Sequence, residues 1–108
     1  TMKLFTKEIE KKLQAQYPQG NSMDQMVVCK IFNPYGRGSW YIMNQDPADP
    51  DYLWAIVDLF EVEEGSVQKS ELENCRIPIG RFNFPLERDL FWEPRPAREV
   101  WDTVVNER

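Results

Sequence analysis

The sequence predicts an α+β fold: a four-stranded, mainly antiparallel sheet in meander order, with an N-terminal helix, a short middle helix and a C-terminal helix. Residues 51–61 are the longest apolar run, and apolar side chains occupy both their odd and even positions, as in a strand buried on both faces. Further strand-like runs separated by turn residues lie within residues 26–69. Residues 96–105 carry apolar side chains at helical spacing. The 108 residues suffice for one core, so we expect residues 1–108 to form a single domain.

The N-terminal helix is predicted to begin after Thr6, because a threonine hydroxyl can accept a backbone hydrogen bond from the first turn. Ile9 and Leu13 are one helical turn apart and give this helix a narrow apolar face. Pro18 and Gly20 end the helix, since proline has no backbone N–H to donate.

Four strands follow. Residues 26–32 and 39–44 are predicted to form an antiparallel hairpin, because the segment between them is rich in glycine and proline. Residues 46–51 contain two prolines and predict a second turn before the central strand. Residues 66–69 are predicted to be a short polar strand at the sheet edge, where polar residues oppose pairing with other chains.

The C-terminal part alternates between helical and irregular patterns. Ser70 and Glu73 match the capping-box pattern, which predicts a short helix beginning at Ser70. Residues 77–84 contain a proline and a glycine, and we expect an irregular segment there. Residues 89–92 are predicted to be extended, and residues 96–105 to form the C-terminal helix.

The formal net charge is −5 and is unevenly distributed. Residues 1–45 hold six basic and three acidic side chains, residues 46–75 hold one and nine, and residues 76–108 hold six and six. An acidic middle argues against nucleic acid as a direct ligand, which requires a positive surface. It is compatible with a basic partner and also with a solvated face that keeps the protein soluble.

The cysteines, the longest apolar run and the first residues of the sequence bear on the cellular location. Two cysteines, Cys29 and Cys75, are too few for a disulfide scaffold, so we expect reduced thiols. The longest apolar run is too short to span a membrane, and the first residues do not resemble a signal peptide. We therefore expect a soluble cytoplasmic protein without membrane association.

Catalytic signatures are missing from the sequence. It has no histidine, no nucleophile elbow, no phosphate-binding glycine loop and no Cys/His metal spacing. Asp46, Asp49 and Asp51 could gather around a hard cation, but a solvated acidic turn explains them as well. We expect no catalytic residue, no metal and no cofactor.

Asp58 is the one acid in a row of the central strand that also holds Trp54 and Ile56. An uncompensated buried carboxylate would cost several kcal/mol, so we expect a partner, with Arg88 and Arg81 as candidates for a bidentate pair. A structural ion pair is a plainer interpretation than catalysis, because such pairs also perturb pKa values.

The C-terminal third interleaves arginines with aromatic residues, a composition that can hold single-stranded nucleic acid. Each arginine has an acid close in sequence, so internal pairing around an aromatic core is the plainer interpretation. Arg81, Phe82 and Phe84 are the expected recognition tip, because Gly80 and Pro85 bracket them.

The chain resembles the small bacterial proteins grouped as domain of unknown function 2958. The resemblance rests on residues 3–9, 30–34, 39–41, 54–60, 70–73, 85–90 and Pro94. The segment Glu87-Arg88-Asp89-Leu90 is its most specific part, whereas Ala55 and residues 78–84 depart from the family pattern. The family occurs on plasmids, conjugative elements and phages, often near anti-restriction genes. The resemblance therefore implies a mobile-element setting in a bacterial cell, without an established activity.

Two functions follow as hypotheses. The first is a non-enzymatic accessory protein that binds a host protein and inhibits a defence nuclease of the restriction or CRISPR type, using an acidic surface at Glu61, Glu63 and Glu64. The alternative is a small-molecule or nucleotide-binding protein, or a small hydrolase. The residues of this alternative carboxylate–arginine pocket are Asp58, Glu87, Arg88 and Asp89. Binding of single-stranded nucleic acid by the aromatic tip is a further, weaker alternative.

Overall fold

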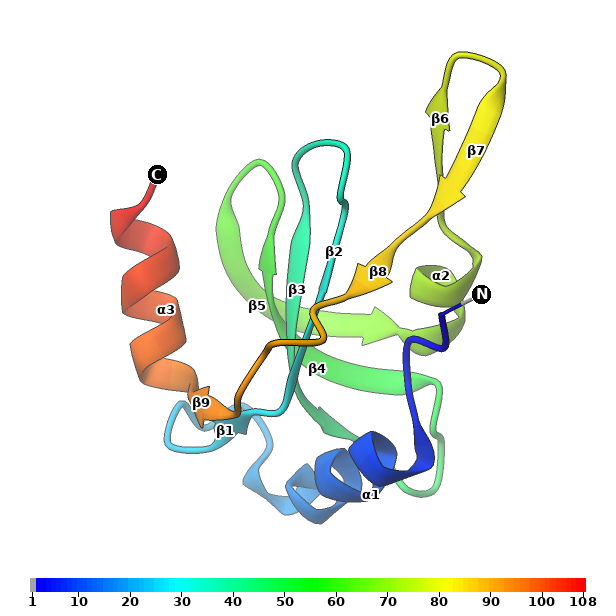
Figure 1. Cartoon of the computed structure of the whole chain (residues 1–108). Helices are drawn as coiled ribbons and strands as arrows, with labels where there is room; N and C mark the ends of the chain where they lie inside the picture. Colours follow the sequence, from blue (N-terminus) through cyan, green and yellow to red (C-terminus); the bar gives the residue numbers. More distant parts are fainter. Residues whose placement is uncertain (1) are drawn as a thin grey trace.

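A computed structural model describes residues 2–108 as an antiparallel sheet with helices on both faces (Figure 1). The main sheet has five strands in the order β5–β4–β3–β2–β8, and two further two-stranded pairs are β1–β9 and β6–β7. The elements are α1 (Lys7–Ala15), η1 (Tyr17–Gln19), β1 (Met26–Val27), β2 (Cys29–Phe32), β3 (Ser39–Gln45), β4 (Tyr52–Asp58), β5 (Val62–Gln68), α2 (Lys69–Asn74), β6 (Arg76–Ile79), β7 (Phe82–Pro85), β8 (Glu87–Arg88), β9 (Arg95–Pro96) and α3 (Ala97–Asn106).

The α+β class and the meander of β2 to β5 are confirmed, since these four strands are sequential antiparallel neighbours. The predicted start of the fourth strand at residue 66 is wrong, because β5 already begins at Val62 and pairs with β4 along its whole length. The predicted number of strands needs correction. β8 pairs with the outer edge of β2 through Ile31 opposite Arg88 and Phe32 opposite Glu87, so the sheet gains a fifth strand. This pairing joins segments more than fifty residues apart, which no local pattern reveals.

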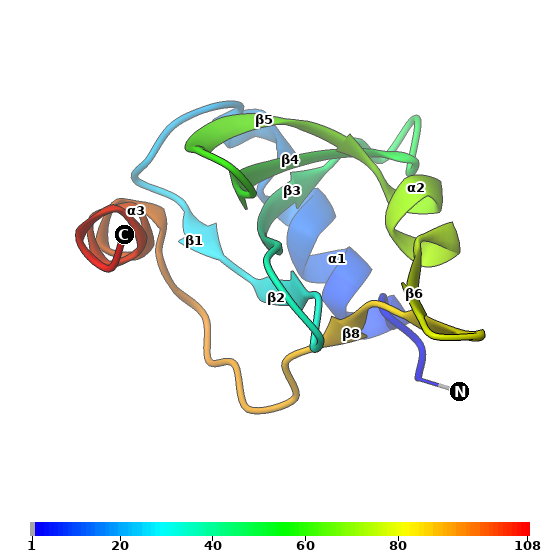
Figure 2. The same cartoon turned by 90° about the horizontal axis from the view of Figure 1, so that it is seen from above.

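β4 is an interior strand, as predicted, and its two faces contribute to two separate cores. Leu53 and Ala55 are fully buried in a cluster with Leu13 of α1. Ile56 is fully buried in a second cluster with Val100 of α3. Figure 2 shows α3 on one side of the strands and α1 with α2 on the other. We call these the α3 side and the α1 side of the sheet.

The two long helices begin as predicted. The Thr6 hydroxyl accepts a hydrogen bond from the Ile9 amide at 3.2 Å and caps α1, which ends before Pro18. α3 begins directly after Pro96 and buries Val100 and Val104 against the sheet. In the described residues 2–108, no helix has the length and apolar character needed to cross a membrane.

The predicted capping box of the middle helix is wrong. α2 begins at Lys69, and no side chain of its own first turn caps it. Instead, Asp51 in the β3–β4 connection accepts hydrogen bonds from the Ser70 amide at 2.7 Å and the Ser70 hydroxyl at 3.1 Å. A carboxylate distant in sequence therefore supplies the negative charge that a helix N-terminus favours.

Two further predictions about the C-terminal half are also wrong. Residues 77–84, expected to be irregular, lie in the antiparallel hairpin β6–β7, which projects from the body of the protein (Figure 1). Asp89 and Trp92, expected within an extended segment, close a turn in which the Trp92 amide donates to the Asp89 carbonyl at 3.3 Å. The proline in β6 is tolerated because a two-stranded hairpin has free edges on both sides.

A β-bulge interrupts the pairing of β3 with β4 between Ile42 and Asn44. Beyond the bulge, Asn44 lies opposite Trp54, on the α3 side. Side chains of a regular strand alternate between faces, and the extra residue at a bulge shifts this alternation. The bulge thus places a polar side chain, only 1% exposed, on a face that would otherwise be apolar.

Candidate functional site: a groove with an acidic rim

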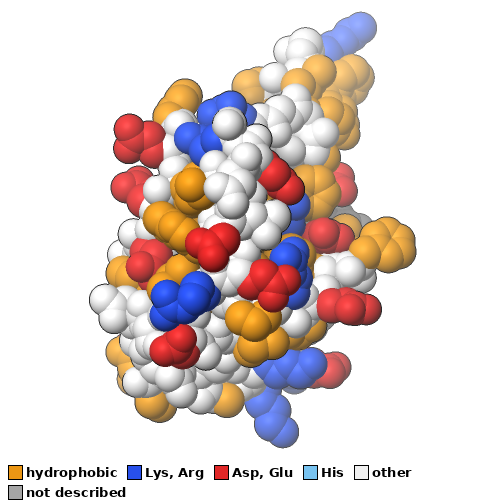
Figure 3. Space-filling view, turned by 90° about the vertical axis from the view of Figure 1, so that its left-hand side faces the viewer, with side chains coloured by type: hydrophobic (Ala, Val, Ile, Leu, Met, Phe, Trp, Pro, Cys, Tyr) orange, Lys and Arg blue, Asp and Glu red, His pale blue; other side chains and the backbone are white. Residues whose placement is uncertain are grey.

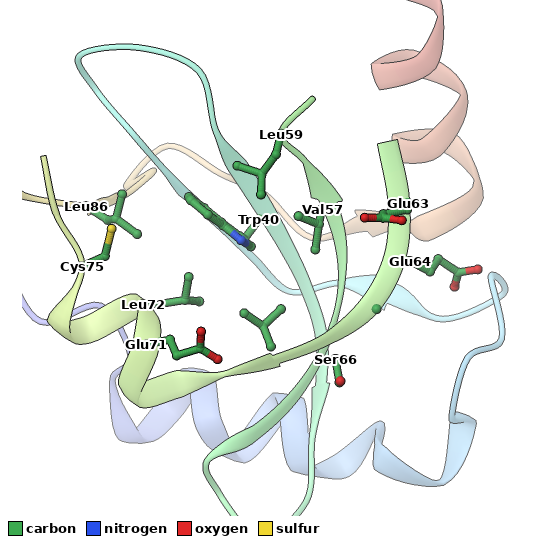
Figure 4. A pocket seen from close by; sticks show the side chains of 12 residues that line it. Trp40, Val57, Leu59, Glu63, Glu64, Ser66, Glu71, Leu72, Cys75 and Leu86 are labelled. Carbon is green, nitrogen blue, oxygen red and sulfur yellow. The ribbon is translucent and has the colours of Figure 1, made fainter. Parts of the chain in front are cut away.

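A groove of about 530 Å³ opens on the α1 side of the sheet, between β3–β5 and α2 (Figure 4). Its size lies within the range of typical ligand pockets. The lining residues are Trp40, Val57, Leu59, Glu63, Glu64, Gly65, Ser66, Val67, Glu71, Leu72, Cys75 and Leu86.

The strand register explains the apolar floor of the groove. Trp40, Val57 and Glu63 lie in one row across β3, β4 and β5. Gly65 lies on the same face, opposite Ala55, and a Cβ atom built on it would meet no atom within 4 Å. Its φ is outside the left-handed region, so the backbone does not require glycine here. The missing side chain keeps the floor open, as glycine in a strand does where another molecule approaches closely.

The rim of the groove is acidic. Glu63 comes from β5 and Glu71 from α2, whereas the lining contains no lysine or arginine. Five ion pairs occur among residues 2–108, and none of them includes an acid between Glu61 and Glu73. The groove therefore combines an apolar floor with negative charge that the rest of the described chain leaves unpaired.

The three acids predicted to form one surface are divided by the structure. Glu61 is exposed in the turn between β4 and β5, and Glu63 lies on the rim of the groove. Glu64 is also among the lining residues, but its side chain points away from the groove in Figure 4, and its Oε1 accepts a hydrogen bond from the Trp54 indole at 3.4 Å on the α3 side. Strand alternation explains this division. Glu71 takes part instead, and no local pattern marks it, because it comes from a separate helix, α2.

Asp58 forms a structural ion pair, but neither predicted arginine is its partner. Its Oδ1 accepts a hydrogen bond from Arg108 Nη2 at 2.9 Å, and its side chain is 25% exposed. Arg108 also donates to the Leu59 carbonyl at 2.8 Å, which fixes the β4–β5 turn. Arg88 instead donates to the Leu4 carbonyl at 2.8 Å and to the Lys3 carbonyl, and so holds the N-terminal segment against β8.

The structure does not bring Asp58 together with Glu87, Arg88 and Asp89. Two strands, β3 and β2, separate β4 from β8 in the sheet. Asp89 Oδ1 accepts a hydrogen bond from the Phe91 amide at 2.9 Å and stabilises the turn after β8. These four residues therefore occupy separate places rather than one carboxylate–arginine pocket.

The predicted recognition tip lies on the projecting hairpin. Arg81 is exposed in the turn between β6 and β7, and Phe82 is 62% exposed. Phe84 is half-buried because its ring packs on Tyr35, with 4.8 Å between ring centroids. Seen from the α3 side, basic and acidic side chains are interspersed, and hydrophobic side chains cover much of the projecting hairpin (Figure 3).

The remaining candidate groups have local structural partners. Asp46 accepts from the Ala48 amide at 2.8 Å and Asp49 from the Asp51 amide at 3.3 Å, and residues 2–108 contain no cluster of acids or cysteines arranged to hold a metal. Both cysteines are free thiols. Burial raises the pKa of Cys29 to about 12, so this thiol is not a nucleophile at neutral pH.

Comparisons with known proteins place the chain in a family but give it no activity. Neither the curated proteins nor the solved structures contain a match to the chain. A model of the family described as protein of unknown function (DUF2958) matches residues 4–107, which is nearly the whole chain. The family expected from the sequence is thereby confirmed, and the chain belongs to the DUF2958 family.

Proposed function

We propose that this chain is a non-enzymatic binding protein whose acidic groove receives a basic segment of a protein partner. The observation that carries the proposal is the set of unpaired acids around an apolar groove that no lysine or arginine lines. A lysine or arginine of a partner has both parts that the groove accepts, because its aliphatic stem packs on apolar surface while its charged head remains at the rim.

Gly65 supports a close approach to the sheet. The open space above it would admit an apolar side chain of the partner between Val57 and Val67 of the floor. A buried anchor in a pocket with a polar rim is a usual arrangement in protein interfaces. The rim charges would contribute mainly to association rate and selectivity.

A nuclease is a partner of suitable chemistry, since its nucleic-acid-binding surface is basic. Binding there would block the substrate and produce the anti-restriction or anti-CRISPR effect expected of a mobile-element accessory protein. We therefore propose a defence nuclease as the partner, and an assay in cells tests this choice.

The groove is tested first with a defined probe, a fluorescein-labelled peptide of alternating lysine and valine, followed by fluorescence anisotropy. We expect the double variant Glu63→Lys with Glu71→Lys to weaken binding by at least about tenfold, because two attractive charges become repulsive. Gly65→Val should weaken binding without changing the charge, because it fills the floor. The matched control is Glu93→Lys with Asp102→Lys, which makes the same change in net charge at exposed acids outside the groove.

The control variant shows whether the peptide binds in the groove or is attracted by the net charge of the protein. Equal loss of binding in the two double variants would contradict the groove as the site. In cells, expression of the protein should raise the transformation efficiency of an unmodified plasmid into a restricting host, and the Glu63/Glu71 variant should not. Peptide binding without any protection from restriction or CRISPR interference would retain the groove and reject the nuclease as partner.

A further inference from the structure

We propose that a second cavity, on the α3 side of the sheet, binds a small uncharged ring compound with hydrogen-bond donors on its edge, as nucleosides and sugars have. The cavity measures about 490 Å³ and lies between η1 and the strands β3 and β4. Its lining residues are Tyr17, Pro18, Gly20, Asn21, Asn44, Tyr52 and Trp54. This inference is independent of the proposed function, because the acidic groove lies on the opposite side of the sheet.

The orientation of the Asn44 amide is fixed by its partners. Asn44 Nδ2 donates to the Gly20 carbonyl and to Gln25 Oε1, each at 2.9 Å. The Gly20 carbonyl can only accept, so the nitrogen and not the oxygen of Asn44 faces it. Gln25 is fixed in turn, since its nitrogen donates to the Gly20 and Ser22 carbonyls at 2.8 Å. Both donors of Asn44 are therefore used within the protein.

The Asn44 oxygen is left for a ligand. Asn44 Oδ1 accepts no hydrogen bond from any group in residues 2–108. Every fully enclosed side-chain nitrogen and oxygen in that range does have a hydrogen-bond partner. Oδ1 therefore keeps a small exposed surface, and because Asn44 as a whole is only 1% exposed and lines this cavity, we infer that this surface faces the cavity. The β-bulge of β3 makes this possible, because it places Asn44 opposite Trp54. Bulges recur beside binding sites, where they redirect a side chain.

The walls define the ligand class. Three aromatic side chains and a proline offer flat apolar surfaces, and nucleobases and sugar rings both pack on such surfaces. None of the lining residues is charged, and the acid Asp46 follows Asn44 by two positions, so the cavity disfavours a phosphate. A single acceptor at the inner end requires an N–H or O–H donor on the ring.

The test is a titration followed by ¹H–¹⁵N NMR, with adenosine, cytidine and methyl β-glucopyranoside as neutral probes and adenosine monophosphate as a charged comparison. We expect saturable shifts of the Asn44 side-chain amide and the Trp54 indole N–H with at least one neutral probe, and weaker binding of the phosphate. The probe that binds separates a nucleoside site from a sugar site. Tyr52→Ser should weaken binding by about tenfold or more, because it removes a stacking wall.

Tyr35→Ser is the matched control, since Tyr35 is also an exposed tyrosine but lies outside the cavity. Asn21→Ala gives a second cavity variant should Tyr52→Ser not fold. The proposal is overturned if no neutral probe shifts these two signals at millimolar concentration, if the cavity variants bind as tightly as the control, or if the phosphate binds as tightly as adenosine.

Discussion

Gly65 and Gly80 both lie beside open space, yet they serve different purposes. A Cβ atom would meet nothing within 4 Å at either position, but only Gly80 has a positive φ, of 61°. We expect Gly65→Ala to raise the free energy of unfolding by about 0.5 to 1 kcal/mol, because alanine lowers the entropy of the unfolded chain. Gly80→Ala should lower it by about 1 kcal/mol, because alanine is strained in that conformation. Urea unfolding of both variants measures this, and a loss of stability at Gly65 would show that the floor of the groove needs glycine.

Asp58 and Arg108 are a second pair of residues whose energy can be measured. Asp58 Oδ1 and Arg108 Nη2 are 2.9 Å apart. The side chain of Asp58 is 25% exposed and that of Arg108 is 29% exposed, so solvent partly screens the pair. We expect Asp58→Asn and Arg108→Gln each to lower the free energy of unfolding by about 1 kcal/mol, less than a fully buried pair would. A double-mutant cycle should give a coupling energy of the same size that decreases with salt. Strictly additive losses would show that the two charges do not interact.

Among the elements, α1, β3 and α2 are joined by one carboxylate. Glu10 Oε2 accepts hydrogen bonds from Lys69 Nζ at 2.9 Å and Gln45 Nε2 at 2.8 Å. Burial by itself would raise the pKa of Glu10, but the hydrogen bonds from Gln45 and Lys69 outweigh it and lower the pKa below its usual 4.5. The carboxylate therefore stabilises the fold above pH 4.5, and this stabilisation is lost as the pH falls through the lowered pKa.

Glu10→Gln tests this connection. At pH 7 we expect the free energy of unfolding of the variant to be about 1 to 2 kcal/mol lower than that of the wild type, because the Lys69 ammonium loses its charged partner. The difference should shrink as the pH falls below 4.5 and through the lowered pKa of Glu10, because the wild-type carboxylate then becomes protonated as well. Chemical unfolding at a series of pH values measures it. A difference that stays constant with pH would mean that the charge is not responsible.

Elements with a strong local pattern were predictable from the sequence, and elements defined by distant partners were not. α1, β4 and α3 follow from apolar spacing and from their terminal residues. The hairpin β6–β7 was missed because its proline and glycine indicate a break, although the glycine is what closes the turn. β8 was missed because two residues carry no periodicity, and its existence depends on the exposed edge of β2.

For the whole molecule, the layout predicts an uneven distribution of local stability. β3 and β4 are flanked by strands on both sides and covered by two cores, whereas β6–β7 pairs only with itself. An isolated hairpin is marginally stable in water. We expect the β6–β7 amides to exchange with deuterium by local opening, well before those of β3 and β4, which should require global unfolding. Native-state hydrogen exchange measures this order, and equal protection would indicate that the hairpin is covered in solution.

The candidate sites show where sequence interpretation ends. The acidic charge of the middle segment was predictable, but strand alternation and a helix decide which acids share a surface, so Glu63 joins Glu71 and not Glu64. The second cavity depends on a bulge, and nothing in residues 39–45 marks the position of the extra residue. Asp58 required a partner, as expected, and the fold rather than the sequence selected Arg108.

The four tryptophans are divided between the two sides of the sheet. Trp54, Trp92 and Trp101 pack against the cluster on the α3 side, and only Trp40 packs on the α1 side, where it lines the acidic groove. Replacing the first three with phenylalanine would leave a single indole at the groove. Its emission wavelength would then report the polarity of that site, so the protein carries its own optical sensor for any molecule that enters.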